Sequence, residues 1–106
     1  KLGFKMSKQD SLGFIEELYS TIKSRAISKK KNSYTNRLLK KGKNKIAQKI
    51  GEESTELIID YLNGSKKRTV EEASDLIYHL LVLLYSKKIS INDIKKELTK
   101  RKNVRR

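Results

Sequence analysis

Five carboxylates stand in two short groups whose spacing suits metal chemistry. Glu52, Glu53 and Glu56 form the first group, and Glu72 and Asp75 stand three residues apart in the second. On a helix, residues three or four apart share a face, so each group directs its charges to one side. Like charges at this spacing repel each other by roughly 0.2–0.5 kcal/mol per exposed pair. A helix that only faced water would alternate the sign of its charges at lower cost.

The two groups can meet if their helices pack side by side. A short turn around Gly64 separates the two segments, which favours an antiparallel pair with the groups level with each other. Carboxylates converging from two helices suit a hard divalent cation, and Mg²⁺ usually shares its coordination with water and substrate phosphates. The spacing therefore indicates a metal site that takes a phosphate-bearing ligand.

Ordinary explanations compete with the metal site. Glutamate-rich helix faces are common and are usually solvated. Glu72 also fits the third position of a capping box that begins at Thr69, and Asp60 and Glu71 are expected to face solvent. The residues alone leave a metal–phosphate site and a solvated acidic face about equally open.

The acidic groups are unusual because the rest of the chain is basic. The 106 residues include 26 Lys+Arg and 12 Asp+Glu, a net charge of +14. Part of that excess follows a skew toward Lys, Ile and Asn that AT-rich codons produce, so it is weak support for nucleic-acid binding. Composition does not explain why residues 52–75 hold seven acids and three basic residues, while residues 23–49 hold eleven basic residues and no acid.

Helical periodicity covers nearly the whole chain. The expected helices span about residues 12–26, 33–41, 46–62, 70–84 and 90–101. Gly42 is expected to end the second helix, and Ser90 to cap the last. The third helix is expected to place on one side Ile46, Ile50, Leu57, Ile58, Tyr61 and Leu62. No segment alternates like a strand, so an all-α, four-helix-bundle-like fold with an extra short helix is predicted.

The organisation is that of one small domain. A basic N-terminal extension (1–10), the helical domain (11–101) and a basic tail (102–106) are expected. With no Cys and one His, any metal has to bind oxygen ligands. No apolar run approaches the ~18–20 residues that span a bilayer, and no secretory signal is evident, so a cytoplasmic location is expected.

Longer stretches of the sequence resemble a known family. Glu52-Glu53-x-x-Glu56 followed by Glu72-x-x-Asp75 is similar to the signature of the MazG-like all-α nucleotide pyrophosphohydrolases. The stretches 33–42, 45–53 and 75–84 narrow the resemblance to the phosphoribosyl-ATP pyrophosphatases, the HisE family. The likeness runs from about residue 15 to residue 101. Asp60 and Tyr61 depart from it, because the family more often has small apolar residues there.

The resemblance implies a reaction and its groups. It implies Mg²⁺-dependent hydrolysis of phosphoribosyl-ATP to phosphoribosyl-AMP and pyrophosphate, the second step of histidine biosynthesis, by a homodimer or higher assembly. Carried over by position, the metal ligands would be Glu53, Glu56, Glu72 and Asp75. Glu52 would be a further ligand or would help Glu53 to position the attacking water.

Basic and hydroxyl side chains are candidates for binding the substrate's phosphates. They are Lys45, Lys49, Arg25, Arg37, Ser33, Tyr34, Thr35 and His79. Each has an ordinary alternative: the lysines can form helical i, i+4 pairs with glutamates, and the arginines can be solvated. Ser33 can cap a helix, Tyr34 can pack, and His79 is more often a core residue than a ligand to substrate.

Two other functions remain open from the sequence. One is a MazG-like hydrolase of noncanonical nucleoside triphosphates, against which only the stretches 33–35 and 78–79 argue. The other is a basic helical module that binds nucleic acid through residues 23–49. The second function leaves the acidic window unexplained, so nucleic acid is an unlikely partner.

Overall fold

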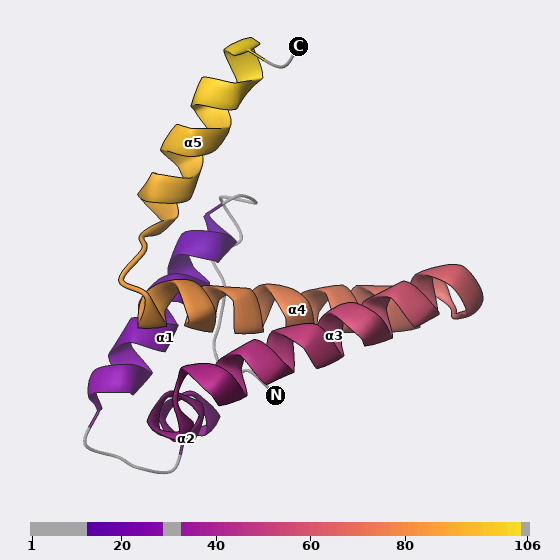
Figure 1. Cartoon of the computed structure of the whole chain (residues 1–106), viewed down its shortest axis with the longest axis horizontal. Coiled ribbons are helices and arrows are strands. Elements are labelled where there is room, and N and C mark those ends of the chain that lie inside the picture. Colours follow the sequence, from indigo (N-terminus) through magenta and orange to yellow (C-terminus); the bar gives the residue numbers. More distant parts are fainter. Residues whose placement is uncertain (1–12, 29–32, 105–106) are drawn as a thin grey trace.

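The computed structural model describes residues 13–28 and 33–104, and all its regular structure is helical (Figure 1). The helices are α1 (Phe14–Ile27), α2 (Tyr34–Lys41), α3 (Lys43–Asn63), α4 (Lys66–Ser86) and α5 (Ile91–Val104). The all-α prediction is confirmed. The predicted extension 1–10 lies outside the described residues. α5 continues three residues past the expected end at Arg101, so residues 102–104 of the predicted tail are helical.

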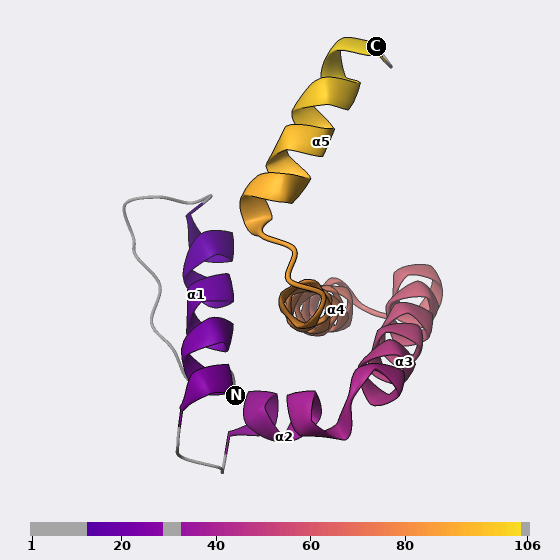
Figure 2. The same ribbon diagram turned by 60° about the vertical axis from the view of Figure 1, so that its left-hand side comes forward.

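α4 is the central helix. Figure 2 looks almost along its axis and shows α1, α2 and α3 arranged around it, with α5 beyond its end. The core forms where these helices meet. Its buried members are Leu18, Ile22, Leu38, Ile46, Tyr78, Leu81, Val82 and Leu84. Because four of the eight come from the second half of α4, the core occupies one end of the molecule.

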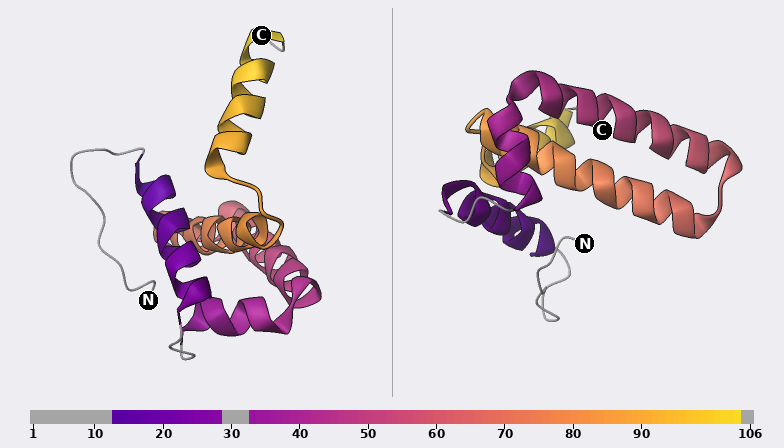
Figure 3. Two further views of the ribbon diagram at one scale, coloured as in Figure 1. Left: turned by 90° about the vertical axis from the view of Figure 1, so that its left-hand side faces the viewer. Right: turned by 90° about the horizontal axis from the view of Figure 1, so that it is seen from below.

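α3 and α4 form a long antiparallel hairpin, and none of the other described helices lies against its distal half (Figure 3). No residue from 54 to 71 is buried. The apolar side predicted for the third helix includes Ile58, Tyr61 and Leu62, which are 58%, 76% and 67% exposed in the structure. Periodicity predicts this apolar face, and no other helix among the described residues covers it.

Helix ends follow local chemistry. Gly42 ends α2 and starts α3 with a φ of 93°, a left-handed conformation that glycine adopts without strain, as predicted. Ser90 and Asp93 cap each other's backbone N–H groups at the start of α5, also as predicted. The predicted cap at Thr69 is wrong. α4 begins four residues earlier, where Ser65 Oγ accepts a hydrogen bond from the backbone N–H of Arg68.

α5 projects from the body and contacts α1 alone among the described helices. Its first turns border α1 along a shallow groove lined by Ile15, Ile91, Ile94 and Leu98. Within the part of the chain that the structure describes, no helix combines the length and apolarity needed to cross a lipid bilayer.

Candidate metal and nucleotide site

Three carboxylates converge where the buried part of the hairpin ends. Oxygen atoms of Glu53, Glu56 and Glu72 all lie within 4.8 Å of one another. Glu53 comes from α3 and Glu72 from α4, and both are buried, while Glu56 is exposed one turn further along α3. The antiparallel hairpin therefore brings together the two groups that the sequence separates by fifteen residues.

Two oxygens of this cluster are buried without a hydrogen-bond partner among the described residues, Glu53 Oε1 and Glu72 Oε1. A buried acceptor left unsatisfied costs about 1–3 kcal/mol, and more when charged. Burial raises the pKa of Glu72 to about 7, with further contributions from Glu56 and Glu53. Crowded, partly desolvated carboxylates of this kind suit a divalent cation, which would supply the missing partner.

Arg68 supports the cluster from the first turn of α4. One guanidinium nitrogen lies 3.1 Å from Glu72 Oε2 and 3.6 Å from Asp60 Oδ2, and the other lies 3.2 Å from Glu71 Oε1. Arg68 therefore holds Oε2 of Glu72, whereas Oε1 is the oxygen left without a partner among the described residues. The sequence interpretation gave Arg68 no role, although its position four residues before Glu72 on a helix was a usable signal.

Glu52 lies outside the group of three. Its carboxylate accepts a 2.8 Å hydrogen bond from Gln48 and lies 3.4 Å from Lys49 Nζ. The hydrogen bond from Gln48 is the main cause of a lowered pKa for Glu52, assisted by Lys49, so Glu52 stays ionised near neutral pH. Lys49 also lies 3.9 Å from Glu53, which is the ordinary helical ion pair that the spacing allowed.

A cavity of about 380 Å³ opens beside Glu53. It is lined by Arg25, Tyr34, Thr35, Lys49, Glu53, Asp75, Tyr78 and His79. Its walls therefore come from α1, α2, α3 and α4, and its charges are mixed. Two cationic side chains face it, Arg25 and Lys49, as expected for a space that receives phosphate. Of its two carboxylates, Glu53 also belongs to the group of three.

His79 links this cavity to α2. Its Nδ1 lies 2.8 Å from the Asp75 carbonyl oxygen and its Nε2 lies 2.9 Å from the Tyr34 hydroxyl. A carbonyl only accepts, so Nδ1 carries the proton, and in the neutral ring Nε2 accepts a hydrogen bond from Tyr34. His79 is 6% exposed and has partners at both ring nitrogens, as expected for a core residue. It also lines the cavity, and its contact with substrate stays a prediction.

A second contact ties the same two helices. The Thr35 and Tyr78 hydroxyls share a short hydrogen bond, and both residues are buried. Burial is the main cause of a raised pKa for Tyr78. Nothing in the sequence indicated this contact, because its two residues are 43 positions apart and leave no local signal. Ser33 accepts a hydrogen bond from the backbone N–H of Asn36, so it caps α2.

The remaining predicted residues are spread more widely. Asp75 lines the cavity but is not one of the three clustered carboxylates. Arg25 lines the cavity, whereas Lys45 and Arg37 do not. The substrate roles of all these residues, and the metal role of Asp75, stay predictions.

Comparison with known proteins identifies the chain's relatives. It matches the family phosphoribosyl-ATP pyrophosphohydrolase over residues 15–102. It is 53% identical over 87 residues to a phosphoribosyl-ATP pyrophosphatase of Sulfolobus acidocaldarius, covering 82% of this chain and 92% of that one. It is 46% identical over 93 residues to that of Clostridium novyi, covering 88% and 84%.

A longer relative is a histidine biosynthesis bifunctional protein HisIE of Caldanaerobacter subterraneus subsp. tengcongensis, 48% identical over 98 residues. The match covers 92% of this chain and 48% of that protein, so this chain spans about half its length. The matches confirm the resemblance that the motifs carried. The chain belongs to the phosphoribosyl-ATP pyrophosphohydrolase family.

Proposed function

We propose that this chain hydrolyses phosphoribosyl-ATP to phosphoribosyl-AMP and pyrophosphate, the second step of histidine biosynthesis, and that it uses Mg²⁺. The family supports the reaction. The observation that supports Mg²⁺ binding is the convergence of Glu53, Glu56 and Glu72. They lie beside a cavity whose lining includes two cationic side chains. A cytoplasmic location belongs to the same proposal.

The donor set fits Mg²⁺, which prefers carboxylate oxygens and retains several waters. Glu53, Glu56 and Glu72 would hold the ion, with Asp75 next to them. When bound, it would neutralise charge on the phosphates and on the leaving pyrophosphate. Arg68 would keep Glu72 in place by holding its Oε2.

Other side chains would bind the substrate and move protons. Lys49 and Arg25 line the cavity and would bind phosphates that the carboxylates alone would repel. Burial acts to lower the pKa of Lys49, but Tyr34 and the adjacent carboxylates outweigh it and raise the value, so Lys49 stays charged. Glu53 lines the cavity and would accept a proton from the attacking water, with ionised Glu52 beside it in the sequence.

We also propose a homodimer formed through the distal half of the hairpin. Its exposed apolar side chains are Ile58, Ile59, Tyr61, Leu62 and Val70, each more than half exposed. Several large apolar side chains left exposed on one segment are typical of an interaction surface. A second hairpin would cover it and would complete a four-helix arrangement, the usual way for two such helices to bury their apolar sides.

Hydrolysis of other nucleoside triphosphates remains the second candidate, because the carboxylate cluster itself does not select the base. The nucleic-acid module is disfavoured, since the match to a hydrolase family accounts for the acidic window. The first test is pyrophosphate release from phosphoribosyl-ATP, ATP and dATP, each with Mg²⁺ and with excess EDTA.

Metal-dependent turnover of phosphoribosyl-ATP alone is the expected result. Preferred turnover of dATP or ATP would move the protein to the second candidate. The variant Glu53→Gln tests the site directly and should lose metal-dependent turnover. Glu97→Gln is its matched control, because Glu97 is an exposed glutamate on α5 paired with Arg101. Equal loss of activity in both variants would contradict the assignment of the site.

A further inference from the structure

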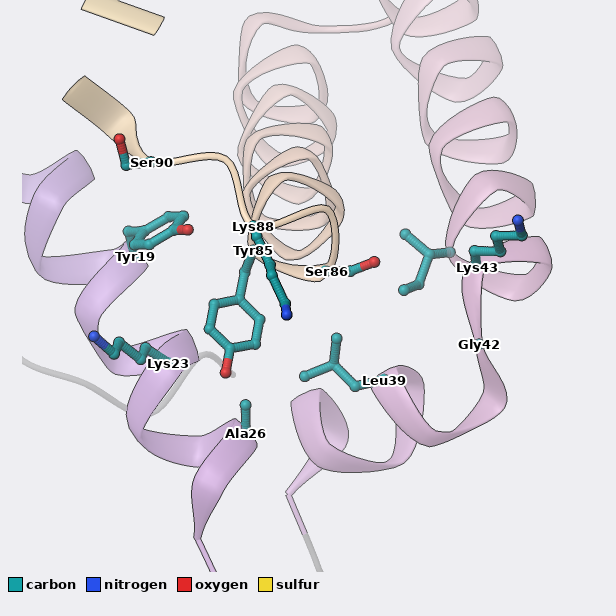
Figure 4. Close-up of a pocket in the computed structure, with 11 residues that line it drawn as sticks. Tyr19, Lys23, Ala26, Leu39, Gly42, Lys43, Tyr85, Ser86, Lys88 and Ser90 are labelled. Carbon is teal, nitrogen blue, oxygen red and sulfur yellow. The ribbon is translucent and has the colours of Figure 1, made fainter. Parts of the chain in front are cut away.

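A second and larger cavity lies at the end of the molecule that contains the hydrophobic core (Figure 4). It shares no lining residue with the first cavity. Its volume is about 640 Å³, within the roughly 300–1,000 Å³ typical of small-molecule sites. α1, α2, the start of α3 and the end of α4 form its walls. Nothing in the proposed hydrolysis uses this cavity.

The walls are aromatic and aliphatic. Tyr85 stands in the middle of the view with Leu39 opposite, and Tyr19 forms a further wall (Figure 4). The Tyr19 and Tyr85 rings pack edge to face with centroids 6.2 Å apart. The Tyr19 hydroxyl donates a 2.6 Å hydrogen bond to the Ile89 carbonyl, which fixes the segment after α4 against α1. These two contacts hold the Tyr19 side of the cavity in place.

The charge at this cavity has one sign. Lys23, Lys43 and Lys88 belong to its lining, and none of the described residues that line it is acidic. Within the described ranges these three lysines make no ion pair. α3 also begins here, at Gly42, with no side-chain cap and no acid in its first turn. Lysine at the positive end of a helix dipole is unfavourable, and an anion at this place would relieve the repulsion.

Lys88, which lines the same cavity, has an unfavourable backbone conformation. It has a φ of 63° at the end of α4, where its N–H donates to the Tyr85 carbonyl and that of Ile89 to the Leu84 carbonyl. This is the helix-ending position at which glycine is preferred, since a side chain strains a left-handed backbone. Figure 4 shows the Lys88 amine pointing toward the middle of the cavity, whereas Lys23 and Lys43 stand at its rim.

We propose that this cavity is a second binding site, for a nucleoside monophosphate. The phosphate would be bound by the Lys88 amine and the uncapped start of α3. The base would lie against Tyr85 and Leu39, because a flat apolar body suits an aromatic wall. Bound phosphate would then account for two locally unfavourable features: the left-handed backbone of Lys88 and the basic, uncapped start of α3.

The test uses the full chain with adenosine monophosphate, and with inorganic phosphate and adenosine as its two halves. Binding is followed by titration calorimetry and by amide NMR shifts. We expect the nucleotide to bind more tightly than either half, with shifts at Tyr85, Leu39 and Lys88. Lys88→Gln should weaken binding roughly tenfold, the loss of one charge-assisted contact. Lys67→Gln removes the same charge at the far end of the hairpin and should change nothing.

Three results would overturn the proposal. They are nucleotide binding no tighter than phosphate, shifts confined to Tyr34 and His79, and unchanged affinity in Lys88→Gln. Lys88→Gly adds a readout that a purely structural lysine would not give. This variant should raise the thermal midpoint because glycine relieves the left-handed strain, and it should lose nucleotide binding. A raised midpoint with intact binding would show that Lys88 does not bind the ligand.

Discussion

The acidic cluster makes a specific prediction about stability and pH. Without metal, Glu72 has a pKa of about 7, raised by burial and by Glu56 and Glu53. The folded protein therefore holds this proton at pH values where the unfolded chain, with an ordinary glutamate value of 4.5, has lost it. The stability contributed by the proton is complete below pH 4.5 and is lost as pH rises through about 7.

The size of the effect follows from the two pKa values. A rise from 4.5 to about 7 corresponds to at most about 3 kcal/mol of unfolding free energy between pH 4.5 and pH 8. Arg68, 3.1 Å from Glu72, opposes part of it. Glu72→Gln keeps an acceptor for Arg68 and mimics the protonated state. The variant should match the wild type near pH 4.5 and exceed it at pH 8.

The assay is urea unfolding followed by helical circular dichroism at several pH values, in EDTA and in Mg²⁺. Other ionisable groups contribute equally to both proteins, so the difference between wild type and Glu72→Gln isolates the cluster. Mg²⁺ binds the ionised carboxylates, so it should stabilise the wild type at pH 8 by mass action, about 2.7 kcal/mol at one hundred times the dissociation constant. It should leave the variant unchanged.

The reasoning fails if the wild type and Glu72→Gln show the same pH dependence in EDTA. It also fails if Glu97→Gln, an exposed glutamate on α5, produces the same difference. In the first case Glu72 is not desolvated by its neighbours. In the second, the effect comes from net charge alone.

Three further outcomes are expected. Glu56→Gln should abolish metal-dependent turnover and leave the helical circular dichroism unchanged, because Glu56 is exposed and contributes little to packing; retained turnover would remove it from the metal ligands. If the proposed dimer forms, Leu62→Glu should convert it to a monomer in light scattering, whereas Ile27→Glu, at a similarly exposed position on α1, should not. Equal assembly in both variants would place the interface elsewhere. Ser65→Ala should lower stability in urea unfolding by about 1 kcal/mol through loss of the α4 cap; no change would return the cap to Thr69.

Local features of the fold were predictable from the sequence because their causes are local. Gly42 ends a helix because glycine adopts a positive φ without strain, and Ser90 with Asp93 forms a capping box within four residues. The cap of α4 was misplaced because Ser65 and Thr69 both fit the pattern. A serine one turn earlier, before three basic residues, gave no acidic signal to choose it.

The site was predictable only in part. Spacing placed Glu53 and Glu72 on facing helices, because a short turn between two helices fixes their register. The contact of Thr35 with Tyr78 and that of Tyr34 with His79 depend on how α2 crosses α4, which no local pattern encodes. The exposure of the distal apolar face could not be predicted for a similar reason. Periodicity shows that a face is apolar, but not whether the covering surface belongs to the same chain.

The boundary between the packed and unpacked halves of the hairpin has a thermodynamic consequence. Glu53 is the last buried residue of α3 and Glu72 the first of α4, so the cluster stands where the core ends. Amide hydrogens beyond that boundary should exchange with solvent faster than those in the core. Under the proposed function, ion binding and pairing of hairpins would order this same segment. Each would then strengthen the other by an equal factor, so metal affinity would fall on dilution of the protein.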